Sequence, residues 1–284
     1  MDVRQQIESL SPRLTGAERK VVAALLADYP FAGLEPIQAF ADKTNVSAPS
    51  ITRFVQKLGC NGYLEFQRRL ISELKESQQS PVELRRRTGP VSEHFLGGFL
   101  TRASEIVSQA GESVTEAQFE RICNTLADEK RAIYLIGGRI SDSVAQYLSR
   151  HLRQIRRDVF HIPSDPEIWP EYLLRMRPRD ILYIVDFRRY EKRLAGLAKN
   201  ASEERGAQII VVTDKWLSPI SGHAKEILAM PIESGTAWDS YCAAIAMTEA
   251  IITRVADRDW DATQRRIKVW DGLRLKRDFE QDEE

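Results

Sequence analysis

A helix start, an apolar stripe and a helix stop follow one another in the stretch Ser47-Ala-Pro-Ser-Ile-Thr-Arg-Phe-Val-Gln-Lys-Leu-Gly59. Ser47 can cap the first turn, Pro49 suits the first helical positions, and Gly59 ends the helix. Apolar side chains recur at i, i+3, i+4 and i+7, which predicts one buried face: Ile51, Phe54, Val55 and Leu58. The other face carries side chains that can reach phosphates and base edges: Ser50, Thr52, Arg53, Gln56 and Lys57.

A second helix is predicted directly upstream, from about Glu35 to Thr44. The turn between the helices is very short, and its Asn45 tolerates the left-handed conformation that such a corner needs. Two helices joined in this way form a helix-turn-helix pattern, with the second helix as recognition helix. The alternative is an ordinary helical hairpin without a nucleic-acid partner. The predicted DNA-binding residues are Ser47, Ser50, Thr52, Arg53, Gln56 and Lys57.

The composition is that of a folded protein without a global electrostatic preference. The chain has 284 residues, 43% hydrophobic content and a formal net charge of zero, so any DNA affinity must come from a local patch. The three cysteines match neither a metal site nor a disulfide framework, and no cofactor motif is present. No apolar run suits a signal peptide or a membrane span, so we expect a cytoplasmic protein without membrane contact.

The first part of the chain is predicted to be a helical DNA-binding domain over residues 1–77. Thr15 and Glu18 form a capping box that opens a helix to about Asp28, and another amphipathic helix runs from Tyr63 to about Lys75. Residues 78–91 are predicted to be a linker because of their polar composition. The arginines at 85–87 could contact DNA phosphates or simply form a solvated charge run.

Residues 92–275 are predicted to form an α/β domain with a doubly wound parallel sheet of about five strands. Two helices, about Ser92–Gln109 and Thr115–Ala127, precede a series of short apolar runs. The predicted strands are Ala132–Gly137, Asp158–His161, Asp180–Asp186, Gln208–Thr213 and Glu226–Pro231. Predicted helices alternate with them: Ser141–Leu152, Pro166–Met176 and Glu191–Arg205.

The loops after three of these strands are the predicted ligand site, because ligands bind at the carboxyl ends of parallel strands. Glycines, hydroxyls and guanidiniums in them can hold an anion, and the candidates are Gly137, Arg139, Ser141, Ser143, Arg188, Arg189, Thr213 and Ser218. Each has another interpretation: Ser141 as an ordinary helix cap, the arginines as partners in an interfacial ion pair, and the third loop as a turn.

Both halves resemble the RpiR/MurR transcriptional regulators. The N-terminal block, from Leu14 through the recognition helix to Phe66, resembles their helix-turn-helix domain. The Gly137–Ser141 loop and the Val212–Ser221 run are similar to those of their sugar isomerase (SIS) domain. The resemblance implies a regulator that binds double-stranded DNA, senses a phosphorylated sugar or other anionic metabolite, and works as a homodimer or homotetramer. A dimer predicts a near-palindromic operator.

The second half departs from that family where a phosphate would bind. Arg139 stands where a second glycine is usual, and Val185-Asp-Phe-Arg-Arg-Tyr190 replaces a Ser-x-Ser-Gly-x-Thr loop. Guanidiniums therefore take the place of hydroxyls. Arg139, Arg188 or Arg189 could contact a phosphate or carboxylate from another direction, or these arginines could close the pocket and leave a domain that only oligomerises.

Isomerase chemistry is the other function considered, since SIS folds also occur in aldose–ketose isomerases. It needs a poised acid or base, and the candidates are Glu249, His223 and His161, which show no catalytic spacing. We expect no enzyme activity and no metal. Apolar residues at helical spacing from Trp260 to Leu275 are predicted to pack on the sheet or on a partner subunit, and residues 276–284 to form an acidic, disordered tail.

Overall fold

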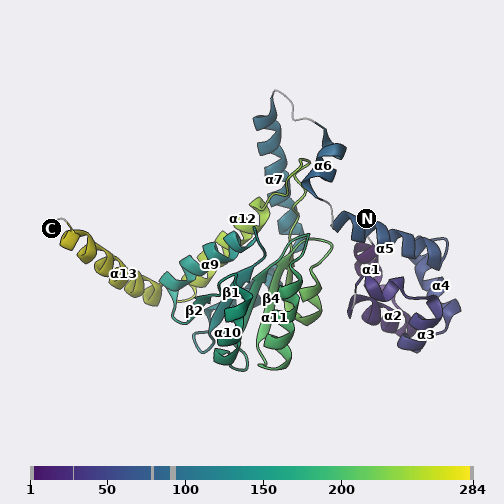
Figure 1. Cartoon of the computed structure of the whole chain (residues 1–284), viewed down its shortest axis with the longest axis horizontal. Helices are drawn as coiled ribbons and strands as arrows, with labels where there is room; N and C mark the ends of the chain where they lie inside the picture. Colours follow the sequence, from purple (N-terminus) through teal and green to yellow (C-terminus); the bar gives the residue numbers. More distant parts are fainter. Residues whose placement is uncertain (1–2, 28, 78–79, 90–93, 282–284) are drawn as a thin grey trace. The chain divides into compact units, whose positions relative to one another are not determined.

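The structure is a computed structural model that describes residues 3–27, 29–77, 80–89 and 94–281. The chain divides into two compact units, Met1–Gln79 and Ser80–Glu284 (Figure 1). We call them the helical unit and the α/β unit and describe each by itself. Within the described ranges, no helix combines the length and apolar character needed to cross a membrane, and no cluster of potential ligands suits a metal ion.

The described residues of the helical unit form five α-helices and two short 3-10 turns. The helices are α1 (Val3–Leu10), α2 (Gly16–Ala27), α3 (Ile37–Thr44), α4 (Ala48–Lys57) and α5 (Tyr63–Ser77), and the turns are η1 (Ser11–Arg13) and η2 (Phe31–Leu34). The predicted inward face of α4 is buried, with Ile51 and Phe54 fully inaccessible. Helix α1 was not predicted, although Val3 and Ile7 share one face and are both buried.

The turn between α3 and α4 has the predicted geometry. Asn45 is left-handed, with φ of 51°, and its N–H donates to the carbonyl of Asp42 at 3.2 Å. Gly59 follows α4 with φ of 72°. Ser47 differs from the prediction. Its hydroxyl forms a hydrogen bond with the Ser50 hydroxyl at 2.9 Å and does not accept a hydrogen bond from a backbone N–H of the first helical turn. A helix-turn-helix is therefore present, with a different role for Ser47.

The α/β unit contains the predicted parallel sheet, which confirms the fold class. Its strands are β1 (Ile133–Gly137), β2 (Val159–His161), β3 (Ile181–Val185), β4 (Gln208–Thr213) and β5 (Ala224–Ala229), in the order β2-β1-β3-β4-β5. The central strands β1 and β3 are buried along their whole length. Strand β5 starts two residues earlier than predicted because, as an edge strand, it is only half-buried and lacks a continuous apolar run.

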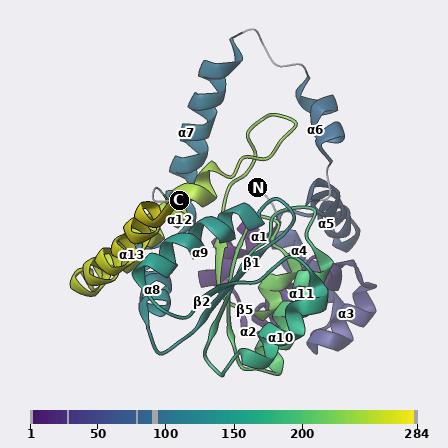
Figure 2. The same cartoon turned by 60° about the vertical axis from the view of Figure 1, so that its left-hand side comes forward.

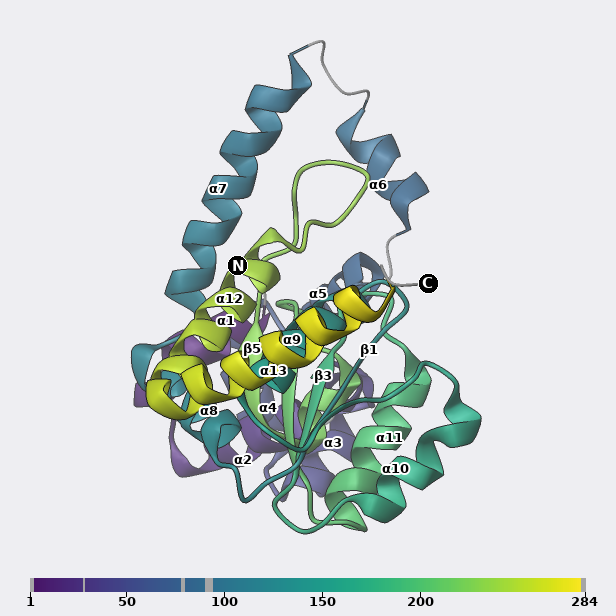
Figure 3. The same ribbon diagram turned by 90° about the vertical axis from the view of Figure 1, so that its left-hand side faces the viewer.

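Helices cover both faces of the sheet, so the unit has two apolar cores. One core joins the sheet to α7 (Phe95–Ser113), α8 (Glu116–Ala127), α9 (Asp142–Ile155) and α12 (Cys242–Asp257). The other joins it to η3 (Pro166–Ile168), α10 (Trp169–Arg175), α11 (Lys192–Glu203) and η4 (Pro219–His223). Figures 2 and 3 show α10 and α11 on the opposite side of the sheet from α9 and α12.

Two predicted irregular segments contain helices instead. Within the predicted linker 78–91, α6 (Pro81–Thr88) begins with a capping box between Ser80 and Glu83, which composition alone did not reveal. The predicted helix start at Ser92 lies outside the described residues. At the other end, α13 (Trp260–Gln281) continues through most of the predicted tail and extends away from the sheet (Figure 1).

The packing predicted for this last helix is wrong as far as the sheet is concerned. Trp270 is 41% and Leu273 is 66% exposed, and the main contacts of α13 are with α9 and α12. Its packing on a partner subunit stays a prediction.

Candidate functional site

The outer face of α4 offers hydrogen-bond donors without an acidic residue. Arg53, Gln56 and Lys57 are exposed, and Ser50 and Thr52 are partly so. The Arg53 guanidinium donates to the Ser50 hydroxyl at 3.2 Å, and the Thr52 hydroxyl donates to the Ala48 carbonyl at 3.1 Å. Arg53 and Gln56 are therefore exposed side chains of the two kinds that bond base edges most often.

Lys57 differs from its neighbours because its ammonium forms an ion pair with Glu18 of α2. Burial raises the pKa of the Glu18 carboxyl, but the contacts with Lys57 and Thr15 outweigh that effect and hold the pKa below its ordinary value. The capping box predicted at Thr15 is confirmed, since the Thr15 N–H donates to Glu18 at 2.8 Å. Lys57 thus links the recognition helix to α2 as well as bordering its exposed face.

The carboxyl ends of β1, β3 and β4 do bring the predicted ligand residues together, but several are already engaged. A Cβ on Gly137 would lie 2.5 Å from the Cα of Asp142, so the β1–α9 turn needs glycine there. The hydroxyl of Ser141 is buried and donates to the Val185 carbonyl at 2.7 Å. The hydroxyl of Thr213 accepts the N–H of Ser218 at 2.9 Å. These groups tie the loops to each other.

Arg188 is also turned inward. Its side chain is 3% exposed and forms a two-point ion pair with Asp239, with Nε at 2.7 Å from one carboxylate oxygen. The guanidinium carbon lies 5.1 Å from the ring centre of Trp216. Guanidinium forks match carboxylates in this geometry. Asp239, 51 residues away in sequence, could not have been predicted as the partner.

Two aspartates that were not proposed as site residues complete this cluster. Asp214 accepts the Tyr190 hydroxyl at 2.6 Å, the Trp216 N–H at 3.0 Å and the Arg188 N–H at 2.5 Å. Asp186 accepts the Ser218 hydroxyl at 2.5 Å. Both directly follow a strand, which is the signal that could have identified them. Ser141, Arg188, Thr213 and Ser218, which the sequence predicts to bind a ligand, each already bond a partner within the chain. Their role in ligand binding stays a prediction.

Three predicted ligand residues remain accessible around this cluster. Arg139 and Arg189 are exposed, and no described residue forms an ion pair with either. Arg189 adopts a left-handed φ of 65°, which is uncommon for a non-glycine residue. Ser143 is exposed, with its hydroxyl donating to the Ile140 carbonyl at 2.9 Å. The positive charges of Arg139 and Arg189 make this edge of the sheet attractive to anions.

The buried aspartates predict a pH-dependent stability. Burial raises the pKa of Asp186 to about 7 and that of Asp214 to about 6, from 3.8. Both carboxyls bind protons more tightly in the folded state, so the stability they contribute is present at low pH and lost as pH rises through these values. We expect the α/β unit to lose roughly 4 kcal/mol of unfolding free energy between about pH 5 and pH 8, of which Asp186 contributes the larger part.

Urea unfolding followed by tryptophan fluorescence measures this unit selectively, because all five tryptophans lie between Trp169 and Trp270. The variant Asp186→Asn should flatten the dependence, since its amide stays neutral throughout. An equally steep dependence in this variant would contradict the assignment to Asp186.

The acid–base candidates for isomerase chemistry lie on separate elements. Glu249 of α12 accepts the Tyr147 hydroxyl at 3.1 Å. His161 at the end of β2 lies 2.9 Å from Asp142, and His223 in η4 lies 3.8 Å from Glu203. These different partners give no shared acid–base arrangement among the three.

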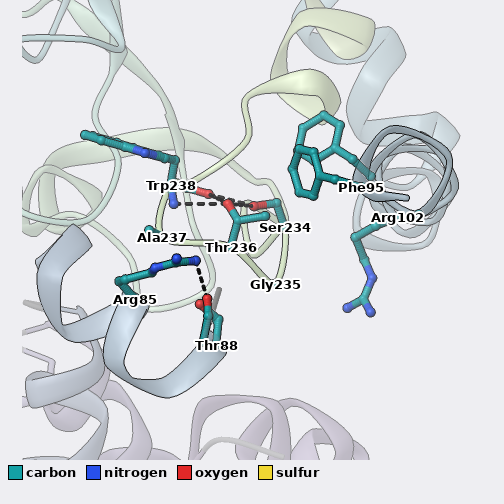
Figure 4. A pocket seen from close by; sticks show the side chains of 12 residues that line it. Arg85, Thr88, Phe95, Arg102, Ser234, Gly235, Thr236, Ala237 and Trp238 are labelled. Carbon is teal, nitrogen blue, oxygen red and sulfur yellow. Dashed lines mark hydrogen bonds between the residues drawn. The ribbon is translucent and has the colours of Figure 1, made fainter. Parts of the chain in front are cut away.

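A separate hollow of about 730 Å³ lies between α6, the start of α7 and the loop 234–238. Figure 4 shows Arg85 on one side of that loop and Phe95 on the other. The hydroxyls of Ser234 and Thr236 are 2.9 Å apart, and each donates to the Trp238 carbonyl. None of the predicted ligand residues lines this hollow.

Each half of the chain matches a model of a known protein family. Residues 1–77 match the model of the helix-turn-helix domain of the rpiR family, and residues 125–254 match the SIS domain. The HTH-type transcriptional regulator HexR of Escherichia coli K12 is 22% identical over 241 residues, covering 83% of this chain and 80% of HexR.

Two solved structures share the architecture. The sugar isomerase domain of an RpiR transcription factor from Sphaerobacter thermophilus has a TM-score of 0.56 at 18% identity, covering 61% of this chain and 96% of that one. The Vibrio vulnificus NanR protein complexed with ManNAc-6P has a TM-score of 0.55 at 16% identity, covering 96% and 98%.

The fold, the exposed recognition helix and the two matched domains define a helix-turn-helix protein that carries a SIS domain. The chain belongs to the RpiR family of transcriptional regulators.

Proposed function

We propose that this regulator binds a near-palindromic operator through the outer face of α4 and that a small anionic metabolite bound by the α/β unit changes its operator affinity. The observation that carries the DNA contact is the exposed, acid-free surface with Arg53 and Gln56 at its centre. A homodimer or homotetramer would place recognition helices about one DNA turn, ~34–36 Å, or a multiple of it, apart. We place this activity in the cytoplasm.

Replacing Arg53 or Gln56 by alanine should weaken specific operator binding by about 1–3 kcal/mol, because a bidentate base contact is lost. Neither side chain supports the core, so the fold should be retained. Fluorescence anisotropy with the operator and with a scrambled duplex at several salt concentrations measures the effect. Lys57→Ala should weaken both duplexes alike.

The matched control for these variants is Arg157→Ala, which removes the same charge from a side chain that is 76% exposed in the α/β unit. It should leave the preference for the operator unchanged. Equal operator affinity in Arg53→Ala, Gln56→Ala and the unchanged chain would refute the proposal that α4 recognises the operator sequence.

The ligand class that fits the exposed edge is a sugar phosphate or another small anion. Arg139 and Arg189 supply free guanidiniums there, and NanR provides a relative with a phosphorylated sugar bound. A thermal-shift screen of phosphorylated and carboxylated metabolites on the unchanged chain, Arg139→Ala and Arg189→Ala tests this site. Equal shifts in all three proteins for every binding metabolite would reject it.

Catalysis is not part of this proposal, because Glu249, His223 and His161 have separate partners. Incubation with sugar phosphates should yield no isomer. Isomer formation that disappears in Glu249→Gln would replace the sensing role by an enzymatic one.

The oligomeric state is tested separately. Light scattering with and without operator distinguishes a dimer from a tetramer.

A further inference from the structure

A second hollow, which we call the α9–β2 cavity, lies between α9 and the edge strand β2. It has a volume of about 250 Å³ and is lined by Gln146, Ser149, Arg150, Arg153 and His161. The four α9 residues recur at i, i+3, i+4 and i+7 and so share one stripe of the helix. None of the residues assigned above to DNA or to the anionic effector lines this cavity.

Positive charge dominates the lining. No described residue forms an ion pair with Arg150 or Arg153. The Arg153 side chain donates from Nε to the Val159 carbonyl at 3.2 Å. Among the described residues, the carboxylate of Asp142 hydrogen-bonds two of the lining residues, Gln146 and His161. It is already engaged by the Gly137 N–H at 2.8 Å, His161 Nε2 at 2.9 Å and Gln146 Nε2 at 3.0 Å.

A buried hydroxyl without a partner is the second observation. Ser149 is 1% exposed, and its Oγ has no hydrogen-bond partner. The comparable hydroxyl of Thr248, buried on α12, donates to the carbonyl of Ala244 at 2.7 Å. A buried hydroxyl without a hydrogen-bond partner destabilises the protein, and an acceptor bound in the cavity would remove that cost.

We propose that the α9–β2 cavity binds the phosphate group of a small metabolite. Two guanidiniums and one hydroxyl can donate to several oxygens of a tetrahedral dianion at once. The cavity is smaller than the roughly 300–1,000 Å³ of sites that enclose drug-sized ligands, so the phosphate fits and a large remainder would extend into solvent. This site does not depend on the effector site proposed around Arg139 and Arg189.

Isothermal titration of the full chain with inorganic phosphate tests the proposal. Arg150 is exposed, so Arg150→Gln removes its charge with little effect on folding, and it should weaken phosphate binding about tenfold or more. Ser149→Ala should weaken it about threefold to tenfold while leaving the unliganded protein at least as stable. Arg157→Gln is the charge-matched control outside both sites and should bind phosphate like the unchanged chain.

Three results would overturn the proposal. One is the absence of saturable phosphate binding to the unchanged chain. Another is phosphate binding that is undiminished in both Arg150→Gln and Ser149→Ala. If Arg189→Gln then abolished the binding, the phosphate would belong to the effector site. The third is malonate binding as tightly as phosphate with the same sensitivity to Arg150→Gln, which would assign a carboxylate ligand instead.

Discussion

The variant Asp239→Ala is expected to lose about 3–5 kcal/mol of unfolding free energy in the α/β unit, because it leaves a buried guanidinium without its carboxylate. Arg188 is 3% exposed and cannot regain its hydration without opening the loop after β3. Tryptophan fluorescence during urea unfolding measures the loss, and Trp216 lies directly against Arg188.

Two controls separate the buried pair from a general loss of charge. Glu233→Ala removes the carboxylate of the exposed pair with Lys215 and should cost about 1 kcal/mol or less. The double variant Arg188→Met with Asp239→Ala removes both charges and should be more stable than Asp239→Ala alone. If Asp239→Ala cost no more than Glu233→Ala, the inward position of Arg188 would be contradicted.

The second large effect is expected in the helical unit. Phe54 of α4 is fully buried in its core, so Phe54→Ala should cost about 3–5 kcal/mol through lost burial and the cavity left behind. A small helical unit has little more stability than this to lose. Helical circular dichroism should fall at moderate temperature, and operator binding should disappear with it.

The helical unit contains no tryptophan, so the fluorescence-detected unfolding of the α/β unit should stay unchanged in Phe54→Ala. The matched control is Phe31→Ala in η2, where the side chain is 49% exposed and little packing is lost. Similar stability in Phe54→Ala and Phe31→Ala would mean that α4 is not packed as described.

Local signals account for most of the fold that the sequence predicted. The left-handed Asn45, Gly59 after α4 and the apolar runs of the central strands depend only on neighbouring residues. Around helix α6 two signals conflict, because the polar composition favours a linker and the Ser80–Glu83 capping box favours a helix. Helix α13 contradicts a tail prediction based on charge alone.

The candidate site was less predictable because its contacts join distant parts of the chain. The sequence placed Arg188 and Ser218 at neighbouring strand ends, but it could not reveal that Asp239 and Asp186 already hold them. Spacing identifies which side chains share an edge of a sheet. It does not tell whether each one faces a neighbour or solvent.

The inward-facing Arg188 also bears on effector selectivity. A loop of hydroxyls and backbone N–H groups surrounds a phosphate and fixes the attached sugar. The exposed guanidiniums proposed for this role, Arg139 and Arg189, would bind the anion without enclosing the rest of the molecule. We therefore expect broad effector specificity: the affinity for related anions should depend on their charge and size more than on the stereochemistry of their carbon skeletons.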